Sequence, residues 1–97
     1  MKIKIKDEFK DDYTTRVAGE RLRNLILASN EPIELDFTNL KIASASFFDE
    51  GIAKLADHGW TATQVEQQVK FNNMFHRDRE LLISVCEYRG LILKIQE

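Results

Sequence analysis

The sequence alternates short segments that have the two-residue period of β-strands with longer segments that have the period of α-helices. Apolar residues alternate with lysines over residues 2–6 and with acidic residues over residues 33–37, which predicts two half-buried strands. Each of these strands is followed by a segment with a helical apolar stripe. Because strands and helices take turns, parallel strands joined by right-handed helical crossovers are the simplest arrangement.

Three segments have the spacing of an amphipathic helix. The spacing predicts helices over residues 15–29, 46–57 and 75–89. Gly59 is placed to end the second helix in a left-handed conformation. Residues 61–67 are compatible with a short helical turn, and two further strands are expected over residues 68–71 and 91–95. We therefore expect a small α/β fold with about four strands, in a mainly parallel or mixed sheet, and three helices.

The length and composition are typical of one small globular domain. The chain has 97 residues, 43% of them hydrophobic and 31% charged, so we expect a single domain over residues 1–97. The core is expected to contain Leu22, Ile26, Leu35, Phe37, Ile52, Leu55, Leu82 and Val85. No apolar stretch is long enough to cross a bilayer. The amino-terminal residues lack the apolar centre of a signal peptide, so a cytoplasmic location is expected, without membrane partners.

Charge and residue types exclude several classes of function. The formal net charge of −2 argues against a protein that grips nucleic acid, because phosphate binding needs a basic excess. Cys86 is the single cysteine, so the chain can form no internal disulfide and no cysteine-based metal cluster. We read this thiol as an inert core residue. His76 could serve Ser46 as a base, but no third catalytic group is identifiable. We expect no catalytic residues, no metal and no cofactor.

The loops that leave the strands are the first place to look for a functional site. In a parallel sheet, residues 7–16, 38–46 and 72–77 would share the edge at the carboxyl ends of the strands. Ser46 is followed by Asp49 three residues later, which resembles a capping box, so Ser46 is expected to cap the second helix. Arg16 either pairs with a neighbouring aspartate, Asp11 or Asp12, or contacts an anion or a partner at this edge.

Two adjacent aromatic residues, Phe47 and Phe48, follow this cap. Because neighbouring residues on a helix point in different directions, we expect one of the two rings to be partly exposed. Such a ring could anchor a partner.

The residues around this loop resemble a known family. The run Leu35-Asp36-Phe37-Thr38-Asn39-Leu40-Lys41-Ile42-Ala43-Ser44-Ala45-Ser46 looks like the strand–loop–helix segment of STAS domains of the anti-sigma-factor-antagonist type. More closely, residues 33–50 resemble the STAS-like DUF4325 family. The residues that match its motif are Asp36, Phe37, Ser44, Ser46, Phe47, Asp49 and Glu50. The resemblance covers about residues 14–89.

The resemblance implies a non-enzymatic regulatory domain that binds a protein, with a histidine-kinase-like ATPase as the implied partner. It also implies a phosphorylatable serine, which aligns with Ser46, with Ser44 as the second candidate. The antagonist pattern Asp-Ser-Ser-Gly is replaced here by Ser44, Ala45, Ser46 and Phe47. The expected partner contacts are Arg16, Thr38, Asn39, Lys41, Ser44, Ser46 and Phe47. The oligomeric state stays open.

Two other functions are compatible with the same residues. One is a small enzyme that acts on an anionic or phosphorylated substrate at this edge. The other is a structural subunit of a larger assembly.

Overall fold

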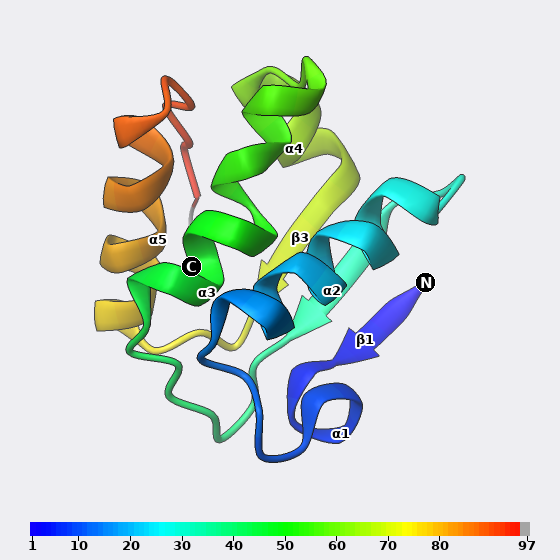
Figure 1. Ribbon diagram of the computed structural model, residues 1–97, viewed down its shortest axis with the longest axis vertical. Helices are drawn as coiled ribbons and strands as arrows, with labels where there is room; N and C mark the ends of the chain where they lie inside the picture. The colour runs from blue at the N-terminus through cyan, green and yellow to red at the C-terminus, as the bar shows by residue number, and fades with distance from the viewer. Residues whose placement is uncertain (96–97) are drawn as a thin grey trace.

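The computed structural model describes residues 1–95, which contain a three-stranded, wholly parallel sheet (Figure 1). Its strands are β1 (Lys2–Lys4), β2 (Ile33–Asp36) and β3 (Val69–Asn72). They lie side by side in the order of the chain, and both neighbouring pairs are parallel. The α/β fold and the parallel sheet are therefore confirmed, and the loops after all three strands leave at one edge.

Within residues 1–95, five α-helices and one 3-10 helix accompany the sheet. They are α1 (Ile5–Phe9), α2 (Arg16–Ala28), α3 (Ala45–Gly51), the 3-10 helix η1 (Ala53–His58), α4 (Ala62–Gln68) and α5 (His76–Tyr88). The first and third predicted helices are confirmed as α2 and α5, and the ambiguous segment forms α4. The second predicted helix is two elements, because the backbone leaves helical geometry at Ile52 (φ −120°, ψ −54°). Gly59 ends η1 at φ +81°, as expected.

One predicted strand is shorter than expected and another is absent from the described residues. The amino-terminal strand was expected to reach residue 6, but α1 begins at Ile5, whose side chain is buried with that of Phe9 four residues later. Residues 91–95 form no strand, although Leu91 and Leu93 are buried. In both segments every second residue is buried, as the alternating pattern indicates. Alternating burial does not require that the backbone be hydrogen-bonded to a neighbouring strand.

The two faces of the sheet differ in chemistry. In register, Ile3, Leu35 and Phe71 share one face, while Lys4, Asp36 and Asn72 share the other. α2 and α3 lie across one face of the sheet (Figure 1). Because the apolar side chains of β2 are buried and the lysines of β1 are exposed, we infer that these helices cover the apolar face.

The core follows the predicted list closely. Seven of those side chains are buried, and Val85 is half-buried. The expectation of one exposed ring among Phe47 and Phe48 is wrong, since both are fully buried. The Phe47 ring packs on Phe9 with 5.7 Å between centroids, and Phe48 packs on Phe37 at 6.4 Å. Both rings can be buried because α3 has neighbours on several sides. These are α2, α5 and the residues Phe9 and Phe37.

A close helix–helix contact explains a glycine in the middle of α2. A Cβ atom added to Gly19 would lie 2.6 Å from Glu50 Cβ and 2.8 Å from the Phe47 carbonyl oxygen. Gly51 on α3 faces the same contact, and a Cβ there would lie 2.9 Å from Leu22 Cδ2. Glycine is unfavourable inside a helix by about 1 kcal/mol relative to alanine. Here it allows the α2 and α3 backbones to approach.

Candidate functional site

The loop between β2 and α3 begins at a buried carboxylate at the edge of the sheet. Asp36, 7% exposed, accepts hydrogen bonds from the Thr38 amide (3.0 Å), from the Thr38 hydroxyl, and from Asn73 Nδ2 (3.0 Å). The bonds from Asn73 and Thr38 lower the pKa of Asp36 to about 2. The carboxylate therefore ties this loop to the loop that follows β3.

A second buried carboxylate fixes the other half of the loop. Asp78, in the first turn of α5, is 2% exposed and accepts hydrogen bonds from the amides of Ile42 (2.7 Å) and Ala43 (2.9 Å). Ala43 has φ +49° and Asn39 has φ +56°, and the left-handed region is unfavourable for alanine. The α5 carboxylate thus helps to hold a loop conformation that the local sequence does not favour.

Ser44, rather than Ser46, caps α3. Its hydroxyl accepts a hydrogen bond from the Phe47 amide (3.2 Å) and donates one to the Thr14 carbonyl oxygen. The predicted cap at Ser46 is wrong, because α3 already begins at Ala45, and Asp49, the partner of Ser46 in the presumed capping box, pairs with two arginines instead. Ser46 lies inside the first turn and is half-buried, and its hydroxyl has no hydrogen bond to the residues that the structure describes.

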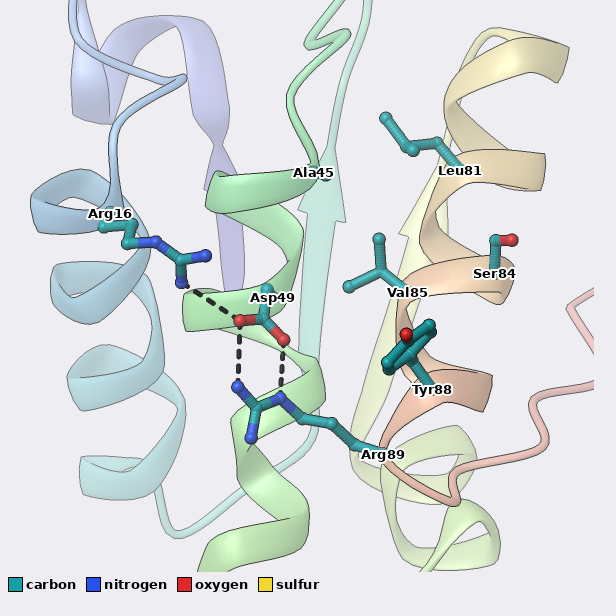
Figure 2. A pocket seen from close by; sticks show the side chains of 8 residues that line it. All are labelled: Arg16, Ala45, Asp49, Leu81, Ser84, Val85, Tyr88 and Arg89. Carbon is teal, nitrogen blue, oxygen red and sulfur yellow. Dashed lines mark hydrogen bonds and ion pairs between the residues drawn. The ribbon is translucent and has the colours of Figure 1, made fainter.

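One of those arginines is the first residue of α2, and the other directly follows the last residue of α5. Arg16 Nη1 lies 3.0 Å from Asp49 Oδ2 and 3.1 Å from Glu50 Oε1. Arg89 approaches the same aspartate from α5 through Nε and Nη2 (Figure 2). The Arg89 bonds, followed by that from Arg16, lower the pKa of Asp49. The prediction that Arg16 pairs with Asp11 or Asp12 is wrong, and its ion pairs instead join α2 to α3.

Glu50 is the most crowded carboxylate of the network. It is 8% exposed and forms ion pairs with Lys54, Arg23 and Arg16. These partners, with Lys54 contributing most, lower the pKa of Glu50 to about 2 in spite of its burial. Such a charge is tolerated inside the protein because it is paired with cations from both η1 and α2.

On the other side of α3 an open groove of about 540 Å³ separates this helix from α5 (Figure 2). We call it the α3–α5 groove, and it is lined by Arg16, Ala45, Asp49, Leu81, Ser84, Val85, Tyr88 and Arg89. Leu81 and Val85 project from α5 toward α3, and Arg89 reaches across to Asp49. Tyr88 is 96% exposed at its rim. The groove thus has apolar walls and a charged end.

The model of a STAS-like domain of unknown function, DUF4325, matches residues 18–74. The chain belongs to this STAS-like family. No curated protein and no solved structure is significantly similar to the chain. The matched residues of this STAS-like domain include the whole β2–α3 loop, whereas α5 and its side of the groove lie beyond them.

Six of the seven predicted partner contacts are exposed or half-buried in the STAS-like domain. The four exposed ones are Arg16, Thr38, Asn39 and Lys41, and Ser44 and Ser46 are half-buried beside them. Phe47 is fully buried, so it cannot contact a partner in this structure and is removed from the site. Sequence reasoning missed Asp78, whose place in a first helical turn does not reveal that it binds amides 35 residues away.

The remaining candidate residues from the sequence are Cys86 and His76. Cys86 is fully buried, as expected of a core residue, and burial raises the pKa of its thiol to about 12. His76 Nε2 lies 2.6 Å from Glu80 on the same helix. Among residues 1–95, no group of three histidine, cysteine, aspartate or glutamate side chains could hold a metal ion. The described helices include none whose length and apolar character would suit a membrane crossing.

Proposed function

We propose that this STAS-like domain is a regulatory module that binds a protein partner through the edge where β2 leads into α3. The contact surface, called the loop surface below, consists of Arg16, Thr38, Asn39, Lys41, Ser44 and Ser46. STAS-like domains are generally non-enzymatic, which agrees with a binding role.

The observation that carries the proposal is the way the loop is held. Asp36 fixes its beginning and Asp78 its end, and both carboxylates are buried, while the side chains of Asn39 and Lys41 between them are exposed. A binding loop that is already ordered loses little conformational entropy when a partner docks. Left-handed residues that the surroundings hold in place are also concentrated at functional sites.

The carboxylates with lowered pKa values favour binding over catalysis. Asp36 is saturated with hydrogen bonds, and Asp49 and Glu50 are paired with arginines and a lysine. A general acid or base needs a pKa near the working pH, whereas these groups stay ionised. These carboxylates therefore suit a structural role, in which they hold the loop surface in place.

Ser46 is the proposed control point of this surface. The Ser44 hydroxyl is engaged in the cap and with Thr14, whereas that of Ser46 is half-exposed and has no hydrogen bond within the described residues. A phosphate on Ser46 would add about −1.5 to −2 charges beside the partner surface. We propose that it displaces the partner, and that the partner is a histidine-kinase-like ATPase.

Isothermal titration with a purified histidine-kinase-like ATPase from the same genome tests the proposal. Lys41→Glu and Ser46→Asp should each weaken binding about tenfold or more, because each adds negative charge to the docking surface. Lys70→Glu is the matched control, since it reverses an exposed lysine on the polar face of the sheet and should bind like the wild type. Equal binding by all three variants would remove the loop surface from the proposal, and no binding by the wild type would remove this ATPase.

A further inference from the structure

The α3–α5 groove has the composition of a protein-binding surface but lies beside the loop surface. Its apolar part is formed by Ala45, Leu81 and Val85, and the ring of Tyr88 stands at its rim with 96% of its surface exposed. Tyrosine and arginine are enriched among the residues that contribute most to binding energy in protein interfaces. An exposed tyrosine between a half-buried valine and an arginine therefore marks a place where a partner can be anchored.

The walls of the groove indicate which backbone conformation its occupant has. Both walls are α-helices, whose backbone groups are already hydrogen-bonded within α3 and α5. An extended peptide gains much of its affinity from hydrogen bonds to an open strand edge, and helical walls offer none. A helix satisfies its own backbone and needs from the groove only apolar contacts and a few polar partners.

The charges at the end of the groove indicate the sign of the occupant. Its charged lining residues are Arg16, Arg89 and Asp49, which leaves an excess of one positive charge in a chain of net charge −2. Arg16 makes both of its bonds through Nη1. Its Nε and Nη2 groups donate to no acceptor within residues 1–95, and its side chain is 57% exposed. These free donors suit a carboxylate.

We propose that the α3–α5 groove binds an acidic amphipathic helix of a protein partner. Apolar side chains of that helix pack on Leu81, Val85 and Tyr88, and one of its carboxylates bonds to the free donors of Arg16. This inference rests on the proposed protein-binding function, but it adds a second contact on α5 and names the chemistry of the partner.

Fluorescence anisotropy with two synthetic helical peptides tests the proposal. Both peptides carry leucines at positions i, i+4 and i+7, and their other positions are mainly glutamate in one and lysine in the other. The glutamate peptide should bind the full chain about tenfold or more tightly than the lysine peptide, and added salt should reduce this difference. Equal binding of the two peptides, or no binding of either, overturns the proposal.

Variants locate the binding site. Tyr88→Ala removes an exposed ring and should weaken binding of the glutamate peptide about fivefold or more without unfolding the protein. Val17→Ala is the matched control, because Val17 is 72% exposed on α2, outside the groove, and should bind like the wild type. Unchanged affinity in Tyr88→Ala overturns the groove as the site.

Two further outcomes separate this proposal from its alternatives. Lys70→Glu should bind the glutamate peptide like the wild type, since Lys70 belongs neither to the groove nor to the loop surface. If Lys41→Glu abolishes peptide binding and Tyr88→Ala does not, the groove fails while the loop surface stands. Concentration-dependent dimerisation that Tyr88→Ala abolishes, measured by sedimentation equilibrium, overturns the proposal in favour of a second copy of this chain.

Discussion

The two sides of α3 are packed in opposite ways. Toward α2, the glycines Gly19 and Gly51 leave no room for a Cβ atom, and Glu50 is surrounded by three cations. Toward α5, the same helix leaves a groove of about 540 Å³ with an exposed tyrosine at its rim. One helix thus forms a close contact with one neighbour, whereas its contact with the other is looser and leaves a groove at the surface.

This difference shows that the two sides of one helix can serve different roles, one in stability and one in binding. Close packing and paired charges position α3 against α2, so its first turn and the loop before it are held in place. The α5 side can then stay open without loss of that order. We therefore expect changes on the α2 side to affect stability and changes on the α5 side to affect binding.

Low pH should reduce the stability of the protein more than any single substitution, because it protonates several paired carboxylates at once. The pKa values of Asp36 and Glu50 are lowered to about 2 from their usual 3.8 and 4.5, so their stabilisation is complete above about pH 4.5 and is lost as the pH falls toward 2. The melting temperature, followed by circular dichroism, should fall through this range. Glu50→Gln should reduce the slope, and a melting temperature that is constant from pH 4.5 to 2 would contradict the structure.

Glu50→Ala should be the most harmful single change at neutral pH. It leaves Arg23, whose side chain is 14% exposed, without its carboxylate, and unpairing a buried ion costs roughly 3–5 kcal/mol. We expect the free energy of unfolding, measured with urea, to fall by about 3 kcal/mol, since Arg16 and Lys54 can turn to solvent. The matched control is Glu20→Ala on the exposed face of α2, which should change stability by less than about 0.5 kcal/mol.

Gly19→Ala should destabilise the domain although alanine is the better helix former. The added methyl group meets Glu50 Cβ and a backbone carbonyl, and such overpacking costs about 1–3 kcal/mol. After the gain of up to about 1 kcal/mol in helix propensity, a net loss of about 1–2 kcal/mol is expected. Asn24→Ala, at an exposed position of the same helix, should be neutral or stabilising. A stabilising Gly19→Ala would show that the two helices are not in close contact.

The two serines before Phe47 should differ in their effect on stability. Ser44→Ala removes the cap of α3 and should cost about 1 kcal/mol. Ser46→Ala removes no hydrogen bond to the described residues and should stay within about 0.5 kcal/mol of the wild type. Thermal melting of both variants under the same conditions checks this, and the reverse order would restore Ser46 as the cap.

Tyr88→Ala should have the smallest effect on stability. Its ring is 96% exposed on the open side of α3, so its removal should change the free energy of unfolding by less than about 0.5 kcal/mol. A loss of more than about 1 kcal/mol in urea unfolding would mean that the groove side also supports the fold, and the comparison between the two sides would fail.

The sequence predicted the elements whose pattern is long and clearly bounded. α2 and α5 were found because their apolar stripes run over three turns, and the segment around Leu35 was found from its alternation. The helix α1 was missed because Ile3 and Ile5 are equally compatible with one continuous strand and with a strand that turns into a helix, and residues 7–9 were expected to belong to a loop. The break after Gly51 was missed because an α-helix and a 3-10 helix bury similar positions.

The sequence predicted where the β2–α3 loop leaves the sheet but not the bonds that this loop and its neighbours form. The loop, Arg16 and the two serines were identified, since they follow strands or begin helices. The sequence could not show that Asp49 faces Arg16 and Arg89, because these contacts join residues 33 and 40 positions apart. The local motif pointed to Ser46 as the cap of α3. The cap is Ser44, whose hydroxyl also bonds to the Thr14 carbonyl oxygen 30 residues earlier in the sequence.

The wholly parallel sheet sets the order in which this chain can fold. β1 pairs Lys2 with Glu34, and β2 pairs Ile33 with Val69, so each strand pair closes a loop of more than thirty residues and no hairpin can form first. Closing such loops costs entropy before any strand contact compensates for it, and proteins rich in distant contacts fold more slowly than helical bundles of similar stability. The helices can form within microseconds. We therefore expect the helices to be largely formed in the folding transition state, where they bring the strands together.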